Sequence, residues 1–369
     1  MAGTAALLGV AALAVSAVPA GALPAGAGGV VAAQRSAVPA LVESVREPTP
    51  GTDFDVLLDR VDANERFGAG GGWWAASKTD DGAGQAAVWA GRADGTGAPE
   101  RISPDDGRSH VSPVTDGKTV VWLTHSRRTT SILARSVDGG PVTTLWWGRR
   151  AVVRLAVDGD LVVFEPGSTP GGRTPHYIRL SDENHTRHRV LPENGGKQGF
   201  NPSVKNGRIA YTMYYRTEPG GPLIYGTEVF DTTTGTFTMM GQLSRPTSYR
   251  PTAITGKHVY WLVQEERDSR ETAVRRADLD GTNVVDLSPG SGPEALQADA
   301  LAASEEALNV SAQGKLWQFS LDGTKHHVSC AAGGQTGVAT PGGRQVIWVD
   351  STSGTPQLVT RTRPVERCR

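Results

Sequence analysis

The residues of this chain that could do metal chemistry gather between positions 182 and 188. Asp182, Glu183, His185 and His188 place two carboxyl groups and two imidazoles in one short segment, and both kinds of group ligate metal ions. A metal needs these ligands to converge, whereas neighbouring residues of a hairpin point to opposite faces. We therefore expect a solvated turn here, and we predict neither a metal nor an organic cofactor.

Carboxyl groups could also cleave glycosidic bonds, a reaction that needs two acids held across a pocket. Asp160, Glu165 and Glu218 are candidates if the fold brings a pair of them together. The sequence has no Gly-x-Ser-x-Gly motif of a serine hydrolase and no His-Glu-x-x-His motif of a zinc protease. We therefore favour a role without catalysis and keep, as the alternative, a carbohydrate-active enzyme with acidic residues at a central pocket.

Aromatic and arginine residues are the candidates for binding, because Tyr, Trp and Arg are common anchors at binding surfaces. In residues 145–150, two adjacent tryptophans precede two arginines, and both tryptophans cannot easily point inward from one turn. The candidate ligand or partner residues are Trp146, Trp147, Arg149, Arg173, Tyr214, Tyr215, Arg216, Tyr249 and Arg250. The alternative is that the tryptophans pack between repeats and the tyrosines pack within solvated loops.

A repeat that runs through most of the chain must position these candidates. Six aromatic residues lie in short apolar runs that follow Gly-containing turns, and Asn309 occupies the same place in one further unit. The aromatic residues are Trp74, Trp122, Phe164, Tyr211, Trp261 and Trp348. Their spacing, 39 to 50 residues between successive units, is typical of a β-propeller with several short strands per blade.

The unit around Trp122 shows the pattern most fully. Residues 110–115 form the expected inner strand, Asp116 and Gly117 a tight hairpin turn, and residues 119–123 a buried second strand. Residues 131–136 and 142–145 are the expected third and outer strands. The pattern predicts an all-β fold, a β-propeller of seven blades of four antiparallel strands, with six blades as the competing count.

The last unit shows only three strands, so a ring would be left with an unpaired sheet edge. An apolar segment, residues 54–61, precedes the first unit, and we predict that it completes the last blade. The two cysteines, Cys330 and Cys368, are expected to form a disulfide that ties the C-terminal tail near this seam.

The N-terminal residues indicate export. Residues 5–18 are an Ala/Leu/Val run and residues 20–22 match a small-residue cleavage pattern, although a positively charged n-region is missing. We predict a signal peptide over residues 1–22, a flexible linker over 23–52 and the propeller over 53–369. The protein is then secreted or extracytoplasmic, with no transmembrane span beyond the signal segment. Because 37 Lys and Arg balance 38 Asp and Glu, we expect no nucleic-acid partner.

The units resemble the TolB-type propeller family and, more loosely, the WD40-like propellers. The TolB-type repeat runs strand, Ser-Pro-Asp-Gly turn, apolar strand. Residues 112–118, Ser-Pro-Val-Thr-Asp-Gly-Lys, are two residues longer, and Asn201-Pro202 and Arg250-Pro251 keep the proline ahead of later turns. The resemblance covers roughly residues 54–365. It implies a propeller that binds proteins or envelope ligands without doing chemistry.

In a propeller, the loop between the second and third strands lies on the same face as the connection to the next blade. The longest of these expected loops are residues 165–176, 215–225 and 264–271, and the connections 191–201 and 241–250 lie among them. Long loops on a rigid scaffold commonly bind ligands. We therefore predict a secreted or envelope-associated, non-catalytic binding or scaffolding propeller that recognises a protein or cell-envelope ligand through this face of blades 2–5.

Overall fold

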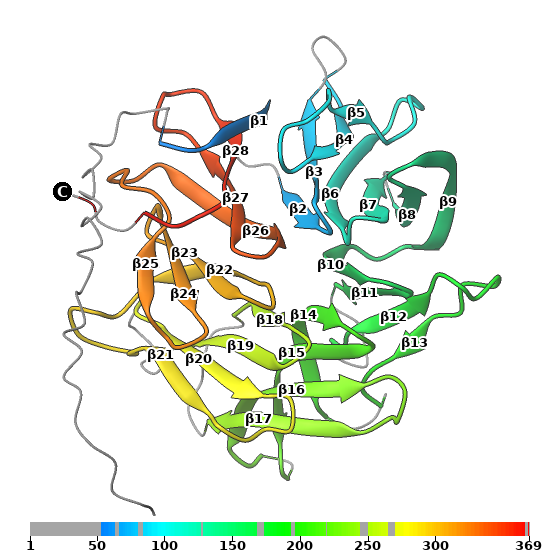
Figure 1. Cartoon of the computed structure of the whole chain (residues 1–369). Helices are drawn as coiled ribbons and strands as arrows, with labels where there is room; N and C mark the ends of the chain where they lie inside the picture. Colours follow the sequence, from blue (N-terminus) through cyan, green and yellow to red (C-terminus); the bar gives the residue numbers. More distant parts are fainter. Residues whose placement is uncertain are drawn as a thin grey trace, which may run out of the picture. The chain divides into compact units, whose positions relative to one another are not determined.

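The computed structural model describes residues 53–62, 66–79, 84–126, 128–167, 173–192, 196–218, 220–243, 250–264, 270–365 and 368. The regular structure of these residues consists of β-strands, which form seven antiparallel sheets of four strands each. Figure 1 shows the seven sheets radiating from a common centre, in chain order around a ring. The described part of the chain contains no helix long and apolar enough to cross a membrane. The predicted signal peptide and linker lie outside the described residues.

Blades 1 to 3 each use four consecutive strands, of which the first is innermost. Blade 1 contains β2 (Phe67–Gly70), β3 (Trp73–Thr79), β4 (Ala86–Arg92) and β5 (Glu100–Arg101). Blade 2 contains β6 (Ser109–Thr115), β7 (Thr119–His125), β8 (Thr130–Ser136) and β9 (Gly139–Gly148). Blade 3 contains β10 (Val152–Asp158), β11 (Leu161–Pro166), β12 (His176–Arg179) and β13 (His188–Arg189).

Blades 4 to 6 repeat this order, and blade 7 departs from it. Blade 4 contains β14 (Gln198–Lys205), β15 (Arg208–Arg216), β16 (Leu223–Asp231) and β17 (Phe237–Leu243). Blade 5 contains β18 (Thr252–Ile254), β19 (His258–Val263), β20 (Ala273–Asp278) and β21 (Val285–Ser288). Blade 6 contains β22 (Ala298–Ala303), β23 (Ala307–Ala312), β24 (Lys315–Ser320) and β25 (Lys325–His327). Blade 7 contains β26 (Gln335–Gly342), β27 (Gln345–Asp350), β28 (Gln357–Arg361) and, outermost, β1 (Val56–Arg60).

The repeated aromatic residues form the core between the blades, as the sequence predicts. All six lie on the second strand of a blade and are at most 4% exposed, and Asn309 is fully buried at the same place in β23. Buried polar atoms need partners. The Trp122 Nε1–H donates to His110 Nδ1 over 3.0 Å, and the Gln318 amide donates to the Asn309 side-chain oxygen over 2.8 Å. The seven four-stranded sheets confirm the prediction of seven blades, and the competing count of six is wrong.

The ring closes where the two ends of the chain share blade 7, as predicted. β1 pairs with β28 in antiparallel register, so the last sheet has no missing strand. The Arg361 guanidinium, 3% exposed, lies 2.8 Å from the Asp53 carboxylate, which also accepts hydrogen bonds from the Ser329 hydroxyl and the Cys330 N–H. The predicted disulfide joins Cys330 to Cys368. Hydrogen bonds, an ion pair and a covalent bond thus all fasten this seam.

Candidate functional site

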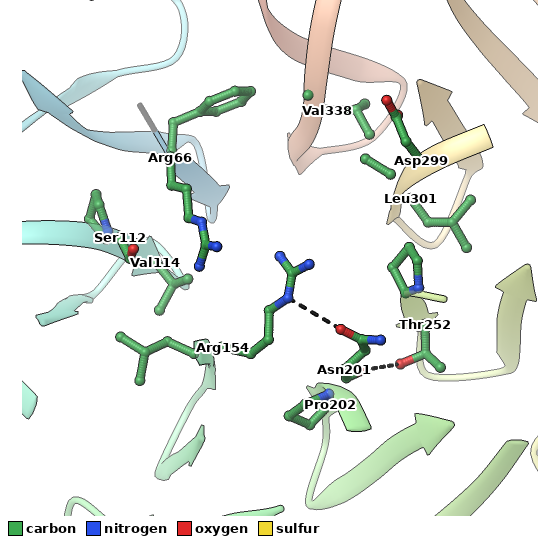
Figure 2. Close-up of a pocket in the computed structure, with 16 residues that line it drawn as sticks. Arg66, Ser112, Val114, Arg154, Asn201, Pro202, Thr252, Asp299, Leu301 and Val338 are labelled. Atoms are coloured by element: carbon green, nitrogen blue, oxygen red, sulfur yellow. Dashed lines mark hydrogen bonds between the residues drawn. The ribbon is translucent and has the colours of Figure 1, made fainter. Parts of the chain in front are cut away.

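A cavity of about 340 Å³ lies at the centre of the ring, at the end where the inner strands begin. All seven blades contribute to it, each through residues within its innermost strand or just before it. We call it the mouth cavity. Its polar side chains are those of Arg66, Ser112, Arg154, Asn201, Thr252 and Asp299, and Figure 2 shows them around one open centre. Leu155, Leu301 and Val338 supply apolar wall.

Irregular inner strands present these side chains to the centre. The pairing register of the inner strand shifts at the mouth cavity in blades 2, 3, 4, 6 and 7. Such bulges re-aim side chains and bend the strand. Ser112 and Asn201 have positive φ values of 55° and 50°, and each precedes a proline. That backbone conformation is costly for a non-glycine residue and is held only by surrounding contacts.

Two guanidinium groups lie at the mouth cavity, from blades 1 and 3. The Arg66 Nη1 donates to the Val153 carbonyl over 2.9 Å, and the Arg154 Nε donates to the Asn201 side-chain oxygen over 3.2 Å. Enclosure by the protein lowers the pKa of Arg154, and the positive charge of Arg66 lowers it further. Within the described residues, neither arginine forms an ion pair. Each therefore keeps further N–H groups for a ligand.

Asn201 is held in place by a buried carboxylate behind the mouth cavity. Glu165, 2% exposed, accepts the Asn201 backbone N–H over 2.8 Å, and the Arg173 guanidinium lies 3.7 Å from its other oxygen. Burial raises the pKa of Glu165, against the Asn201 hydrogen bond and the charges of Arg173 and Arg154, which lower it. The Asn201 amide also donates to the Arg250 carbonyl over 3.2 Å. Asn201 thus connects blades 3, 4 and 5 and orients Arg154.

Two further charged residues lie at this site, Arg250 of blade 5 and Asp299 of blade 6. Asp299 lies at the register shift of β22, with an exposed side chain that lines the mouth cavity. Arg250, half-buried beside it, donates to the Gln264 side-chain oxygen over 3.2 Å. Burial lowers the pKa of Arg250, and the negative charge of Asp299 partly offsets this. The mouth cavity is therefore lined by the cations Arg66 and Arg154, from blades 1 and 3, and by the carboxylate of Asp299, from blade 6.

A second cavity, of about 360 Å³, lies at the other end of the ring, where the inner strands end. Its acids are bound to the turns of neighbouring blades. Asp116 accepts the Gly159 N–H over 2.9 Å, Asp158 accepts the Asn206 N–H over 2.7 Å, and Glu305 accepts the Gly256 N–H over 2.6 Å. We call this the turn end; its carboxylates are engaged within the fold.

The structure brings two of the predicted binding residues to the site and disperses the others. Arg173 and Arg250 border the mouth cavity through Glu165 and Asn201. Tyr214, Tyr215 and Arg216 belong to β15, not to a long loop. The expected loop 215–225 is wrong because β15 and β16 pair as far as Arg216 and Leu223, with Tyr214 opposite Tyr225. Cross-strand aromatic pairs of this kind stabilise a sheet.

The two tryptophans lie within β9, the outer strand of blade 2, and not in a turn after it. Trp147 is 68% exposed, whereas Trp146 is partly buried against Phe164 of blade 3, with ring centres 5.3 Å apart. Arg149 follows β9 on the exposed rim. Tyr249 lies outside the described residues. The prediction that these residues bind a ligand stays a prediction.

The predicted chemical groups do not form a catalytic pair or a metal cluster in the described part of the chain. Asp160 bonds to Ser181, Glu165 is buried behind the mouth cavity, and the Glu218 carbonyl closes a turn with the Gly221 N–H. Asp182 accepts backbone N–H groups of its own turn, from Asn184 and Thr186. No group of three or more possible metal ligands converges among the described residues.

Sequence reasoning missed four residues of the mouth cavity, namely Arg66, Arg154, Asn201 and Asp299. Two weak signals could have found some of them. Arg154 is the one charged residue in β10 before the strand's final aspartate, and Asn201 precedes a proline inside an inner strand. Charged or left-handed residues in a strand that should be apolar indicate that the strand faces a cavity. Asp299 carries the same signal, as the one charged residue of β22, whereas Arg66 precedes β2 and carries none.

No known family profile matches the sequence, and no curated protein matches it. Solved structures do match. The β-propeller domain of the Trilobed protease from Pyrococcus furiosus, described as having an open velcro topology, superposes with a TM-score of 0.60 at 12% identity, covering 84% of this chain and 98% of that one. In this chain, by contrast, β1 and β28 close the ring.

Two of the other similar structures are of peptidases. A prolyl endopeptidase, studied for the role of inter-domain dynamics in catalysis and specificity, gives a TM-score of 0.56 at 17% identity over 84% of this chain and 49% of that one. A puromycin-hydrolyzing peptidase of Mycobacterium tuberculosis gives 0.54 at 14% identity, over 87% and 56%. This chain thus spans about half the length of these two peptidases. Identities this low establish the fold alone.

TolB from Acinetobacter baumannii is also among the similar structures, with a TM-score of 0.44 and 13% identity over 82% of this chain and 79% of that one. The chain is a seven-bladed β-propeller, so the propeller fold that its resemblance to TolB-like and WD40-like propellers implied is confirmed.

The prediction of a non-catalytic binding or scaffolding module is contradicted by these comparisons, because several similar structures are peptidases. That prediction relied on the lack of catalytic motifs in the repeats. The reasoning was unsound, since a propeller can be one domain of a protease, as in the Trilobed protease, whatever motifs the propeller itself carries.

Proposed function

We propose that this propeller is the substrate-handling part of a peptidase and that the mouth cavity binds the peptide. The observation that carries the proposal is the pair Arg66 and Arg154 at the centre of the ring, each with further N–H groups and with no ion-pair partner among the described residues. The peptidases of similar fold support the class of reaction. Since this chain spans about half their length, the hydrolytic centre belongs, in this proposal, to another part of the same assembly.

A peptide carboxylate suits these two arginines. The planar guanidinium group donates two parallel hydrogen bonds to a carboxylate, and charge-assisted bonds of this kind are roughly twice as strong as neutral ones. Asn201 fixes Arg154, so little side-chain freedom remains to be lost when a ligand binds. The propeller would then deliver a peptide in a fixed orientation.

We also propose that the protein works outside the cytoplasm. The disulfide between Cys330 and Cys368 supports this location, because disulfides persist in oxidising compartments.

The test combines binding with hydrolysis. Isothermal titration calorimetry should detect trialanine binding to the purified protein, and Arg154→Ala should weaken it at least tenfold. Protein isolated from its producing cells should hydrolyse the same peptide, with KM raised in the variant and kcat unchanged. Arg149→Ala is the matched control, because it removes an exposed arginine on the rim of blade 2 that the sequence favoured. Equal losses in both variants, or no peptide binding by the wild type, would refute the proposal.

A further inference from the structure

We infer that the mouth cavity selects short peptides in which both ends are free, with the carboxylate on Arg66 and Arg154 and the ammonium group on Asp299. This inference rests on the proposed peptidase function and adds a substrate class to it. It follows from the distribution of charge around the cavity, since cationic and anionic side chains approach the same space from different blades.

Asp299 is available to a ligand. The bulge in β22 leaves it out of register with β23, and its exposed side chain lines the cavity. Within the described residues it has neither a hydrogen bond nor an ion pair. Figure 2 shows its carboxylate on the blade 6 side, with the guanidinium groups of Arg66 and Arg154 extending toward the centre from blades 1 and 3.

The cations do not need Asp299 as their partner, because other contacts hold them. Arg66 is bound to the Val153 carbonyl and Arg154 to Asn201, while the buried Glu165 interacts electrostatically with Arg154. The negative charge of Asp299 acts to raise the pKa of Arg250, which is itself bound to Gln264. Two charged positions of opposite sign therefore remain on the cavity wall. A zwitterionic ligand satisfies both at once.

The walls and the size of the cavity limit the rest of the ligand. Leu155, Leu301 and Val338 form apolar surface between the charged groups. A volume of about 340 Å³ is near the lower end of the range for small-molecule pockets, roughly 300–1,000 Å³. A di- or tripeptide with small apolar side chains fits this description, whereas a long chain would have to leave at least one terminus outside.

Blocking either end of the peptide should weaken binding, because it leaves a charged group of the protein desolvated and unpaired. Acetylation removes the ammonium group and should cost at least tenfold in affinity. Amidation removes the carboxylate and should cost at least as much, since two guanidinium groups lose their acceptor. The two effects should multiply, because they act at different sides of the cavity.

The experiment is a titration of four peptides against three proteins. The peptides are trialanine, N-acetyl-trialanine, trialanine amide and the doubly blocked form, and the proteins are the wild type, Asp299→Asn and Arg154→Ala. Asp299→Asn should abolish the penalty for acetylation and keep the penalty for amidation. Arg154→Ala should reduce the penalty for amidation, since Arg66 remains, and should keep the penalty for acetylation. Circular dichroism and thermal melting establish that each variant is folded, and Asp299→Ala provides a second test should Asp299→Asn not fold.

The outcomes separate the inference from the proposed function. If the wild type binds N-acetyl-trialanine as tightly as trialanine, or if Asp299→Asn keeps the acetylation penalty, the inference is wrong while peptide handling stands. If none of the four peptides binds, both the inference and the proposed function are wrong. Tighter binding of hexa-alanine than of trialanine would also contradict the inference, because the longer peptide cannot place both termini inside the cavity.

Discussion

The two ends of the central channel are built from the same seven inner strands but use their charges differently. At the turn end, Asp116, Asp158 and Glu305 each accept a backbone N–H from a neighbouring blade, so their charge fastens one blade to the next. At the mouth cavity, Arg66, Arg154 and Asp299 have few contacts with the described protein and line open space. Charge at one end stabilises the ring, and charge at the other remains available to a ligand.

This difference follows from local backbone structure. The turn end consists of tight hairpins, in which a short acid lies beside exposed N–H groups and accepts them. Gly117 in one such hairpin has a φ of 93°, and a Cβ there would lie 2.5 Å from the Gly71 Cα. The mouth cavity is lined by bulged stretches of the inner strands, which aim longer side chains inward. The comparison teaches that acids or bases counted from a sequence have no functional meaning until their hydrogen bonds are known.

The largest loss of stability should come from the seam of blade 7, where the ion pair between Arg361 and Asp53 is buried. Arg361→Ala would leave Asp53 buried without its cation, and breaking a buried pair in this way typically costs about 3–5 kcal/mol. Chemical denaturation should show this loss in the free energy of unfolding. The exposed Arg363→Ala is the control. Equal stability of the two variants would show that the ion pair does not hold the ring closed.

A smaller loss is expected at the turn end. Asp116→Ala removes the acceptor of three backbone N–H groups, those of Lys118, Thr119 and Gly159, and should cost about 2 kcal/mol. Asp138→Ala, in the outer Asp-Gly turn of the same blade, is the control because its exposed side chain has no hydrogen bond within the described residues. If the two variants unfold at the same denaturant concentration, the acids of this end do not fasten the blades.

Arg154→Ala should have the opposite result, with little loss of stability and a large loss of peptide binding. We expect its free energy of unfolding to stay within about 0.5 kcal/mol of the wild type, as for substitutions outside the packed core. Trialanine binding should nevertheless fall at least tenfold, which corresponds to about 1.4 kcal/mol. Thermal melting and calorimetry on the same sample measure both quantities. A large loss of stability would mean that Arg154 stabilises the fold as the acids of the turn end do. That result would contradict the difference between the two ends of the channel.

Acid should destabilise the seam through Asp53. Burial alone would raise its pKa, but hydrogen bonds from Arg361, Ser329 and Cys330 outweigh burial and lower it. Its stabilising contribution is therefore complete above the range in which an unfolded aspartate titrates, and it is lost as the pH falls toward the depressed pKa. As the pH falls, the free energy of unfolding should decrease less steeply in Asp53→Asn than in the wild type. Identical slopes would contradict this assignment.

Glu165, behind the mouth cavity, should give stability the opposite dependence on pH, and its effect should be smaller than that of Asp53. Burial raises its pKa, so the folded state holds this proton more tightly than the unfolded state does. Its contribution to stability is therefore greatest at low pH and decreases as the pH rises through the raised pKa. Glu165→Gln should remove this decrease while keeping an acceptor for Asn201. A wild-type profile unchanged by the substitution would show that Glu165 does not titrate in this range.

Much of the fold could be predicted from the sequence because the repeat has a strict physical basis. A residue such as Trp122 must be buried between blades, and a turn such as Asp116-Gly117 must precede it, so both recur with the blade. The pairing of β1 with β28 followed from the missing strand of the last unit. The disulfide followed from the count of two cysteines.

Less of the site could be predicted. Arg173 and Arg250 were found because they lie near long connections, but Arg66 and Asp299 lie far apart in sequence and meet only across the ring. Tyr215 was assigned to a loop because sequence cannot say where a hairpin stops pairing. Trp147 was expected in a turn and lies in a strand.

The sequence by itself determined the blade and the way the ring closes, and it favoured seven blades over six, because these depend on local hydrophobic periodicity and turn chemistry repeated along the chain. Only the tertiary structure decided which charges are engaged and which are available. That outcome depends on seven strands from distant parts of the chain converging on one axis, and on small register shifts that turn a side chain toward the channel or away from it.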